Sequence, residues 1–155
     1  MFDSAPLPSS SLLTKIATKW ALQSTQAMEL YYMITAQHQL LLGTRVLVAE
    51  DDMILALEVE RSLRNAGAEI FGPAKTAADA TALARTAPLT CAVLDVNLGC
   101  ELVFPAAHVL RERGINTIFC TGYGDLHVLQ QHWPDAQVLS KPVSSQRLIR
   151  AIRTA

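Results

Sequence analysis

The chain has 155 residues, half of them hydrophobic, and its formal net charge at pH 7 is −1. This length and composition predict one domain with a sizeable core, and they exclude disorder over most of the chain. The balanced charge argues against the broad basic surface that nucleic-acid binding needs, and it gives no attraction to anionic membranes.

The first 43 residues differ from the rest of the chain. They carry only four charged groups. Their apolar residues recur at helical spacing, at Leu13, Ile16, Ala17, Trp20, Ala27, Tyr31, Ile34 and Leu41. We therefore expect a helical extension over residues 1–43 and a separate domain over residues 44–155. An amphipathic helix needs a surface to cover, so the extension packs on the domain, forms a homodimer through residues 10–42, or binds a partner. In the alternative, the natural start is Met28 or Met33 and the upstream part is unstructured.

From residue 45 onward, strand-like and helical patterns alternate. We expect strands at 45–49, 69–72, 91–95, 115–120 and 137–140. We expect helices between and after them, at 53–65, 76–87, 103–113 and 144–153. The segment 122–136 is less regular, and we expect a shortened fourth helix there. Apolar strands that alternate with helices are typical of a parallel sheet covered on both faces.

Three cysteines, Cys91, Cys100 and Cys120, are an odd number without C-x-x-C spacing, which argues against a disulfide framework or a zinc site. Cys91 and Cys120 lie inside apolar runs, so we expect both to be buried. Reduced thiols are typical of cytoplasmic proteins, and we expect that location. No run of 18 uninterrupted apolar residues is present, so no transmembrane helix is expected.

Polar residues follow four of the expected strands. They are Glu50-Asp51-Asp52, Asp95-Val96-Asn97, Thr121 and Lys141-Pro142. Ligands of open parallel sheets bind beyond the carboxyl ends of the strands, so we expect these groups to converge there. A carboxylate that accepts a phosphoryl group needs a hard cation, a hydroxyl or amide donor and a lysine beside it. The four groups contain acids that can bind the cation, the Thr121 hydroxyl and the Lys141 ammonium.

Taken in order, these residues resemble the receiver domain of two-component response regulators, over about residues 44–155. The resemblance implies an α/β, flavodoxin-like, doubly wound five-stranded parallel sheet with strand order 2-1-3-4-5. It implies that Asp95 accepts a phosphoryl group, and that Thr121 and Lys141 hold the phosphoryl oxygens.

The same resemblance implies a Mg²⁺ site made by Glu50, Asp51, Asp95 and Asn97. Asp51 would contact the metal directly, Glu50 through water, and Asn97 through its backbone carbonyl. Asp52 falls just beyond the acidic pair and is expected to begin a helix, where the helix dipole favours a negative charge.

Residues 119–124, Phe-Cys-Thr-Gly-Tyr-Gly, are similar to the Phe-Ala-Thr-Gly-x-Tyr motif of a receiver subgroup. Cys120 replaces the alanine, and Tyr123 falls one place early. Those receivers are often stand-alone partners of HWE-type histidine kinases, so the resemblance implies such a kinase as phosphodonor. Val138 stands where many receivers carry a switch aromatic, which points to signalling through residues 122–136, with Tyr123 as the aromatic candidate.

The expected function is that of a stand-alone receiver and not of an enzyme. Asp95 would take a phosphoryl group from a kinase phosphohistidine, and the chain would signal by protein contact or act as a phosphate sink. We expect no DNA-binding domain after the last helix, so the output would not be DNA binding. An aspartyl-phosphate phosphatase of the haloacid-dehalogenase type is the alternative, but it needs an acid where Asn97 stands. A degenerate receiver that acts as a constitutive interaction module also stays open.

Overall fold

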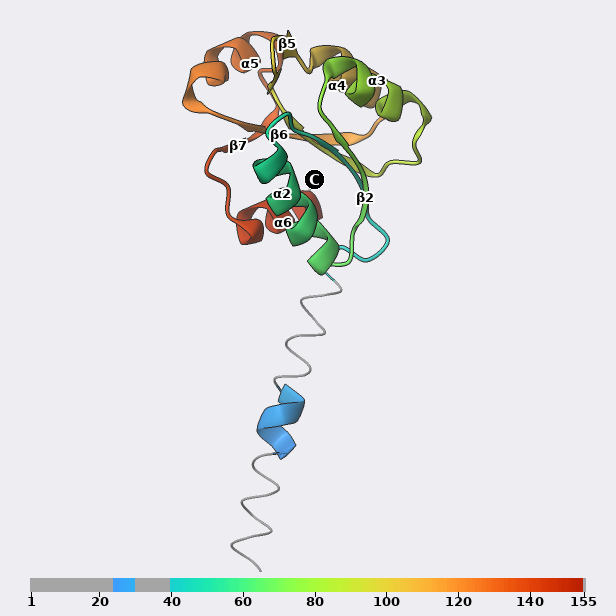
Figure 1. Ribbon diagram of the computed structural model, residues 1–155, viewed down its shortest axis with the longest axis vertical. Helices are drawn as coiled ribbons and strands as arrows, with labels where there is room; N and C mark the ends of the chain where they lie inside the picture. Colours follow the sequence, from blue (N-terminus) through green and yellow to red (C-terminus); the bar gives the residue numbers. More distant parts are fainter. Residues whose placement is uncertain (1–23, 30–39, 155) are drawn as a thin grey trace, which may run out of the picture. The chain divides into compact units, whose positions relative to one another are not determined.

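The computed structural model describes residues 24–29 and 40–154 (Figure 1). The chain divides into two units between Gln37 and His38. In the first unit, residues 24–29 are helical, and the rest of the expected N-terminal helix lies outside the described residues. The predicted domain boundary at residue 43 stays a prediction, although Leu41 is already buried in the core of the second unit.

Five parallel strands form the main sheet of the second unit, in the order β2-β1-β3-β6-β7. Their bounds are Arg45–Ala49 for β1, Glu69–Ala74 for β2, Cys91–Asp95 for β3, Asn116–Thr121 for β6 and Gln137–Ser140 for β7. Numbered among themselves, these strands have the predicted order 2-1-3-4-5 of a flavodoxin-like, doubly wound sheet. The chain order reverses between β1 and β3, and such a reversal opens a crevice at the carboxyl edge.

Helices cover both faces of the sheet, because successive residues of each strand point to opposite sides. On β1, Val46 and Val48 face one hydrophobic cluster, whereas Leu47 and Ala49 face the other. The first face packs against α2 (Met53–Asn65) and α6 (Ser145–Thr154), and the second against α3 (Ala77–Thr86), α4 (Phe104–Glu112) and α5 (Leu126–His132) (Figure 1). None of the helices in the described ranges is long and apolar enough to cross a bilayer.

The structure contains a small hairpin that the sequence pattern did not predict. Strands β4 (Asn97–Leu98) and β5 (Glu101–Leu102) pair in antiparallel fashion between β3 and α4. Gly99 begins the connecting turn with a φ of +69°, a conformation that glycine adopts at little cost. Strands of two residues are too short to show an alternating pattern, which is why this element was missed.

Strand β2 continues two residues past Gly72, where the prediction ended it. Gly72 has a φ of +115°, and a Cβ atom on it would lie 2.5 Å from the carbonyl oxygen of Val48 in the neighbouring strand. The β1–β2 register shifts between Leu47 and Ala49, at the same place. Glycine is therefore required here both by the backbone conformation and by the close approach of β1.

The segment between β6 and β7 holds the predicted short helix. A 3₁₀ turn, η1 (Tyr123–Asp125), leads into the seven residues of α5. Trp133 follows α5 and contacts the neighbouring elements through its ring. Its centroid lies 5.8 Å from that of Phe119 on β6 and 5.0 Å from that of His108 on α4, and the Arg111 guanidinium carbon lies 4.4 Å from it. These contacts hold a helix that is too short to be stable by itself.

The predicted burial of Cys91 and Cys120 is confirmed. Cys91 and Cys120 are buried, and Cys100 is exposed in the β4–β5 turn. Burial raises the pKa of the Cys91 thiol to about 11 and that of the Cys120 thiol to about 12. Because the thiolate is the reactive form, neither buried thiol should react with an alkylating agent in the folded protein.

We therefore expect iodoacetamide at pH 8 to add one group to the native protein, on Cys100. Intact-mass analysis should then show three groups after the protein is unfolded in guanidinium. Rapid addition of a second group to the native protein would contradict the burial of Cys91 and Cys120.

Candidate functional site

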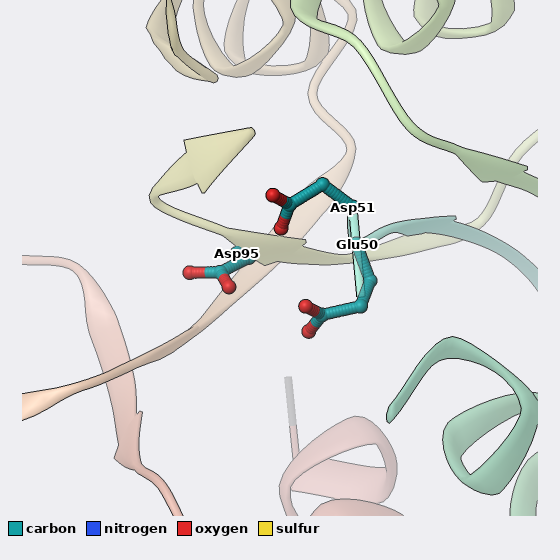
Figure 2. A group of neighbouring side chains, drawn as sticks. All are labelled: Glu50, Asp51 and Asp95. Atoms are coloured by element: carbon teal, nitrogen blue, oxygen red, sulfur yellow. The ribbon is translucent and has the colours of Figure 1, made fainter. Parts of the chain in front are cut away.

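Three carboxylates meet at the carboxyl edge of the sheet. Glu50 and Asp51 follow β1, Asp95 ends β3, and one oxygen from each lies within 4.8 Å of the others (Figure 2). The two strands are parallel neighbours, with Ala49 opposite Leu94, so the residues at their ends leave the sheet at the same point. The structure thus brings together the three acids that the sequence analysis selected as metal ligands.

Lys141 reaches two of these acids from the end of β7. Its Nζ atom lies 2.5 Å from Asp95 Oδ2 and 2.6 Å from Glu50 Oε2. Burial lowers the pKa of Lys141, but the hydrogen bonds and charges of Asp95 and Glu50 outweigh it and raise this pKa above its usual value. Burial raises the pKa of Glu50, which is only 4% exposed, although the Lys141 ammonium partly offsets this. A fixed positive charge therefore lies between two poorly hydrated carboxylates.

The β4–β5 hairpin orients the other carboxylate oxygens. The Gly99 N–H donates to Asp51 Oδ2 at 3.0 Å, and the Asn97 N–H donates to Asp95 Oδ1 at 3.4 Å. The expectation for Asp52 is confirmed, because its carboxylate accepts hydrogen bonds from two first-turn amides of α2. The hairpin thus adds Gly99 to the site, and no pattern in the sequence marked this residue.

Thr121 ends β6 and is fully buried. Its hydroxyl donates to Asp125 Oδ2 in η1 at 3.2 Å, and its carbonyl accepts the Lys141 N–H at 2.9 Å. Since Asp95 lies opposite Cys120 in the β3–β6 pair, Thr121 stands one residue further along, between the strand of Asp95 and that of Lys141. In this structure the Thr121 hydroxyl is thus hydrogen-bonded to Asp125 and not to a carboxylate of the acidic cluster.

Two predictions concern the switch region. Val138 is half-buried in β7 and packs against the core on the α3–α5 side of the sheet. The side chain of Tyr123 lies outside the described residues, so its proposed part in signalling stays a prediction.

A cavity of about 430 Å³ opens beside the acidic cluster, between α2 and α6. Glu50, Asp95 and Lys141 line it together with apolar side chains of both helices, such as Leu55 and Leu148. The ion pairs of Lys141 thus lie at the border between a polar cluster and an apolar wall.

The donor set fits a hard divalent cation such as Mg²⁺. It offers carboxylate oxygens only, in a small number that leaves room for bound water, as this ion prefers. Glu50, Asp51 and Asp95 would hold the ion, and the contribution of the Asn97 carbonyl stays a prediction. When bound, Mg²⁺ would supply positive charge to the oxygens of an incoming phosphoryl group.

A doubly wound parallel sheet with an acidic site at its point of reversal places the second unit among the flavodoxin-like α/β folds. No family model and no curated protein matches the chain. Solved structures do. The chain is similar to a response regulator receiver protein from Sinorhizobium medicae WSM419, with 26% identity and a TM-score of 0.64 over 72% of this chain and 92% of that one.

It is also similar to the signal receiver domain of a modulated diguanylate cyclase from Desulfovibrio desulfuricans G20, with 25% identity and a TM-score of 0.65 over 72% of this chain and 91% of that one. The response regulator PhyR from Brucella abortus gives 23% identity and a TM-score of 0.64 over 78% of this chain, which spans 51% of PhyR. The sheet-bearing unit thus has the fold of a response regulator receiver domain, and the predicted resemblance to that class is confirmed.

Proposed function

We propose that this chain is a response regulator of two-component signalling, and not an enzyme, whose Asp95 accepts a phosphoryl group from a histidine kinase. One observation carries the proposal. In a receiver fold, the Lys141 ammonium lies within 2.6 Å of both Asp95 and Glu50, with the Asp51 carboxylate beside them.

The proposed transfer has a simple balance. A carboxylate oxygen of Asp95 attacks the phosphorus of a kinase phosphohistidine, an O–P bond forms, the P–N bond breaks, and the imidazole leaves with the electron pair and takes up a proton. Lys141 carries the positive charge next to the attacked group, and Thr121 can donate its hydroxyl proton to a phosphoryl oxygen. Glu50 and Asp51 serve the proposed Mg²⁺ site.

We further propose that the kinase is of the HWE type, on the strength of the motif at residues 119–124. The output is protein contact through residues 122–136, or the chain acts as a phosphate sink. Its reduced cysteines favour the cytoplasm, and its balanced charge does not favour a nucleic-acid or membrane partner. A homodimer through residues 10–42 is part of the same proposal. It is tested by comparing the apparent mass of the full chain with that of a chain that starts at His38, the first residue of the second unit.

Intact-mass analysis after incubation with acetyl phosphate and Mg²⁺ tests the chemistry. We expect one labile phosphoryl group per chain, which is absent when Mg²⁺ is chelated and absent in Asp95→Asn. The matched control is Asp135→Asn, which removes an exposed carboxylate outside the site and should leave the adduct unchanged.

A folded protein that takes no phosphoryl group from acetyl phosphate or from any phosphorylated histidine kinase would contradict the proposed function. Transfer from kinases of other types, but not from HWE kinases, would overturn only the choice of kinase.

A further inference from the structure

The hydroxyl of Thr121 already has an acceptor in the unphosphorylated protein. It donates to Asp125 Oδ2 at 3.2 Å, from a residue with no exposed surface. A hydroxyl has one proton to donate, so Thr121 cannot serve Asp125 and a phosphoryl oxygen at the same time. The two acceptors therefore compete for one buried donor.

Asp125 also lies at the start of α5, so loss of its hydrogen bond with Thr121 would affect that helix. It ends η1 and occupies the N-cap position of α5, yet its side chain makes no capping hydrogen bond there. The first amides of a helix need acceptors, and a carboxylate at this end is stabilised by the helix dipole. A carboxylate released by Thr121 is thus close to a second set of donors.

From this geometry we infer that Asp125 is a positioning residue for phosphoryl acceptance, an inference that rests on the proposed function. In the unphosphorylated protein Asp125 holds the Thr121 hydroxyl. When Asp95 carries a phosphoryl group, the hydroxyl turns to it, and the Asp125 carboxylate passes to the first turn of α5. The exchange couples the acceptor site to α5 without the aromatic switch that Val138 replaces.

The test is a double-mutant cycle on the full chain, with acetyl phosphate below saturation, Mg²⁺ present and the phosphorylated fraction read by intact mass. Asp125→Ala leaves the buried Thr121 hydroxyl unpaired in the unphosphorylated state, whereas in the phosphorylated state it removes only a helix cap that water can replace. We expect the ratio of phosphorylated to unphosphorylated protein to rise on the order of tenfold. Asp125→Asn keeps an uncharged acceptor of the same shape and should give a smaller rise.

Thr121 decides whether the effect is specific. In a Thr121→Ala background, Asp125→Ala should change the ratio by less than about twofold, because the shared proton is gone. Asp135→Ala, which removes an exposed negative charge after the same helix, should not change it. Hydrogen exchange of the first α5 amides should slow on phosphorylation of the wild type and not of Asp125→Ala.

The outcomes separate this inference from the proposed function. If the wild type takes no phosphoryl group on Asp95, both fail. If it does, but Asp125→Ala leaves the ratio unchanged or has the same effect with and without Thr121, the inference alone is overturned. Asp125→Asn decides the matter if Asp125→Ala does not fold.

Discussion

Lys141→Met is expected to lower the free energy of unfolding by about 3 kcal/mol in metal-free buffer. Lys141 is the cation that pairs with Asp95 and Glu50, and those side chains are 11% and 5% exposed. Its loss leaves two poorly hydrated carboxylates next to each other without a counter-ion. Lys141 itself is 24% exposed, so the expected loss lies at the lower end of what the removal of one partner of a buried pair costs. Urea denaturation of both proteins, with EDTA present, measures this loss.

Lys141→Met also separates the effect of the Lys141 ammonium from that of Mg²⁺. Without the ammonium, the three carboxylates should gain more from Mg²⁺, so millimolar Mg²⁺ should stabilise Lys141→Met more than the wild type. Phosphorylation by acetyl phosphate should nevertheless fall at least about tenfold, because the lysine charge on the phosphoryl oxygens is missing. Lys75→Met, at an exposed lysine in the loop before α3, is the control and should change stability by less than about 0.5 kcal/mol. Equal Mg²⁺ stabilisation of the variant and the wild type would argue against a metal site at this cluster.

Gly72→Ala is expected to destabilise the protein by at least about 3 kcal/mol. The new Cβ atom would lie 2.5 Å from the Val48 carbonyl oxygen and 2.9 Å from the Ala74 nitrogen, both of them backbone atoms that cannot move without disturbing the β1–β2 pair. The φ of +115° is also unfavourable for alanine. Since Glu50 follows β1 directly and its N–H donates to the Ala74 carbonyl, the acidic cluster should lose affinity for Mg²⁺ as well.

Gly114→Ala provides the control for backbone conformation alone. Gly114 has a φ of +67°, but a Cβ atom added there would meet no other atom within 4 Å. We expect a cost of about 1 kcal/mol for this substitution, measured in the same urea series. Similar losses at the two glycines would mean that the close approach of β1 contributes nothing.

The main sheet could be predicted because its strands are short and mostly apolar, and polar residues of the site follow four of the five. The alternation of strands and helices predicted a parallel sheet, whose carboxyl edge was expected to bring Glu50, Asp51 and Asp95 together. The strand order itself came from the resemblance to receivers. Lys141 was also predicted to belong to the site. Nothing in the sequence, however, predicted that its ammonium would contact both Glu50 and Asp95. Such a contact depends on side-chain reach in three dimensions.

Other features of the site depend on local geometry that leaves no pattern. The β4–β5 hairpin has strands of two residues, and the hydrogen bond from Gly99 to Asp51 comes from a backbone amide, which any residue except proline carries. Asp125 lies four residues after Thr121 in the least regular segment of the domain, where spacing does not predict contact. These are the parts of the site that only the folded chain reveals.

The contacts of Trp133 give the domain an optical property. Its indole ring packs on Phe119, which lies two residues before Thr121 on the same strand, and Trp133 is the C-cap of α5, the helix that follows Asp125. Emission from this ring depends on its neighbours, and among them are an imidazole and a guanidinium. Any rearrangement of η1 and α5 that alters this packing is thus recorded as a change in fluorescence, without an added label.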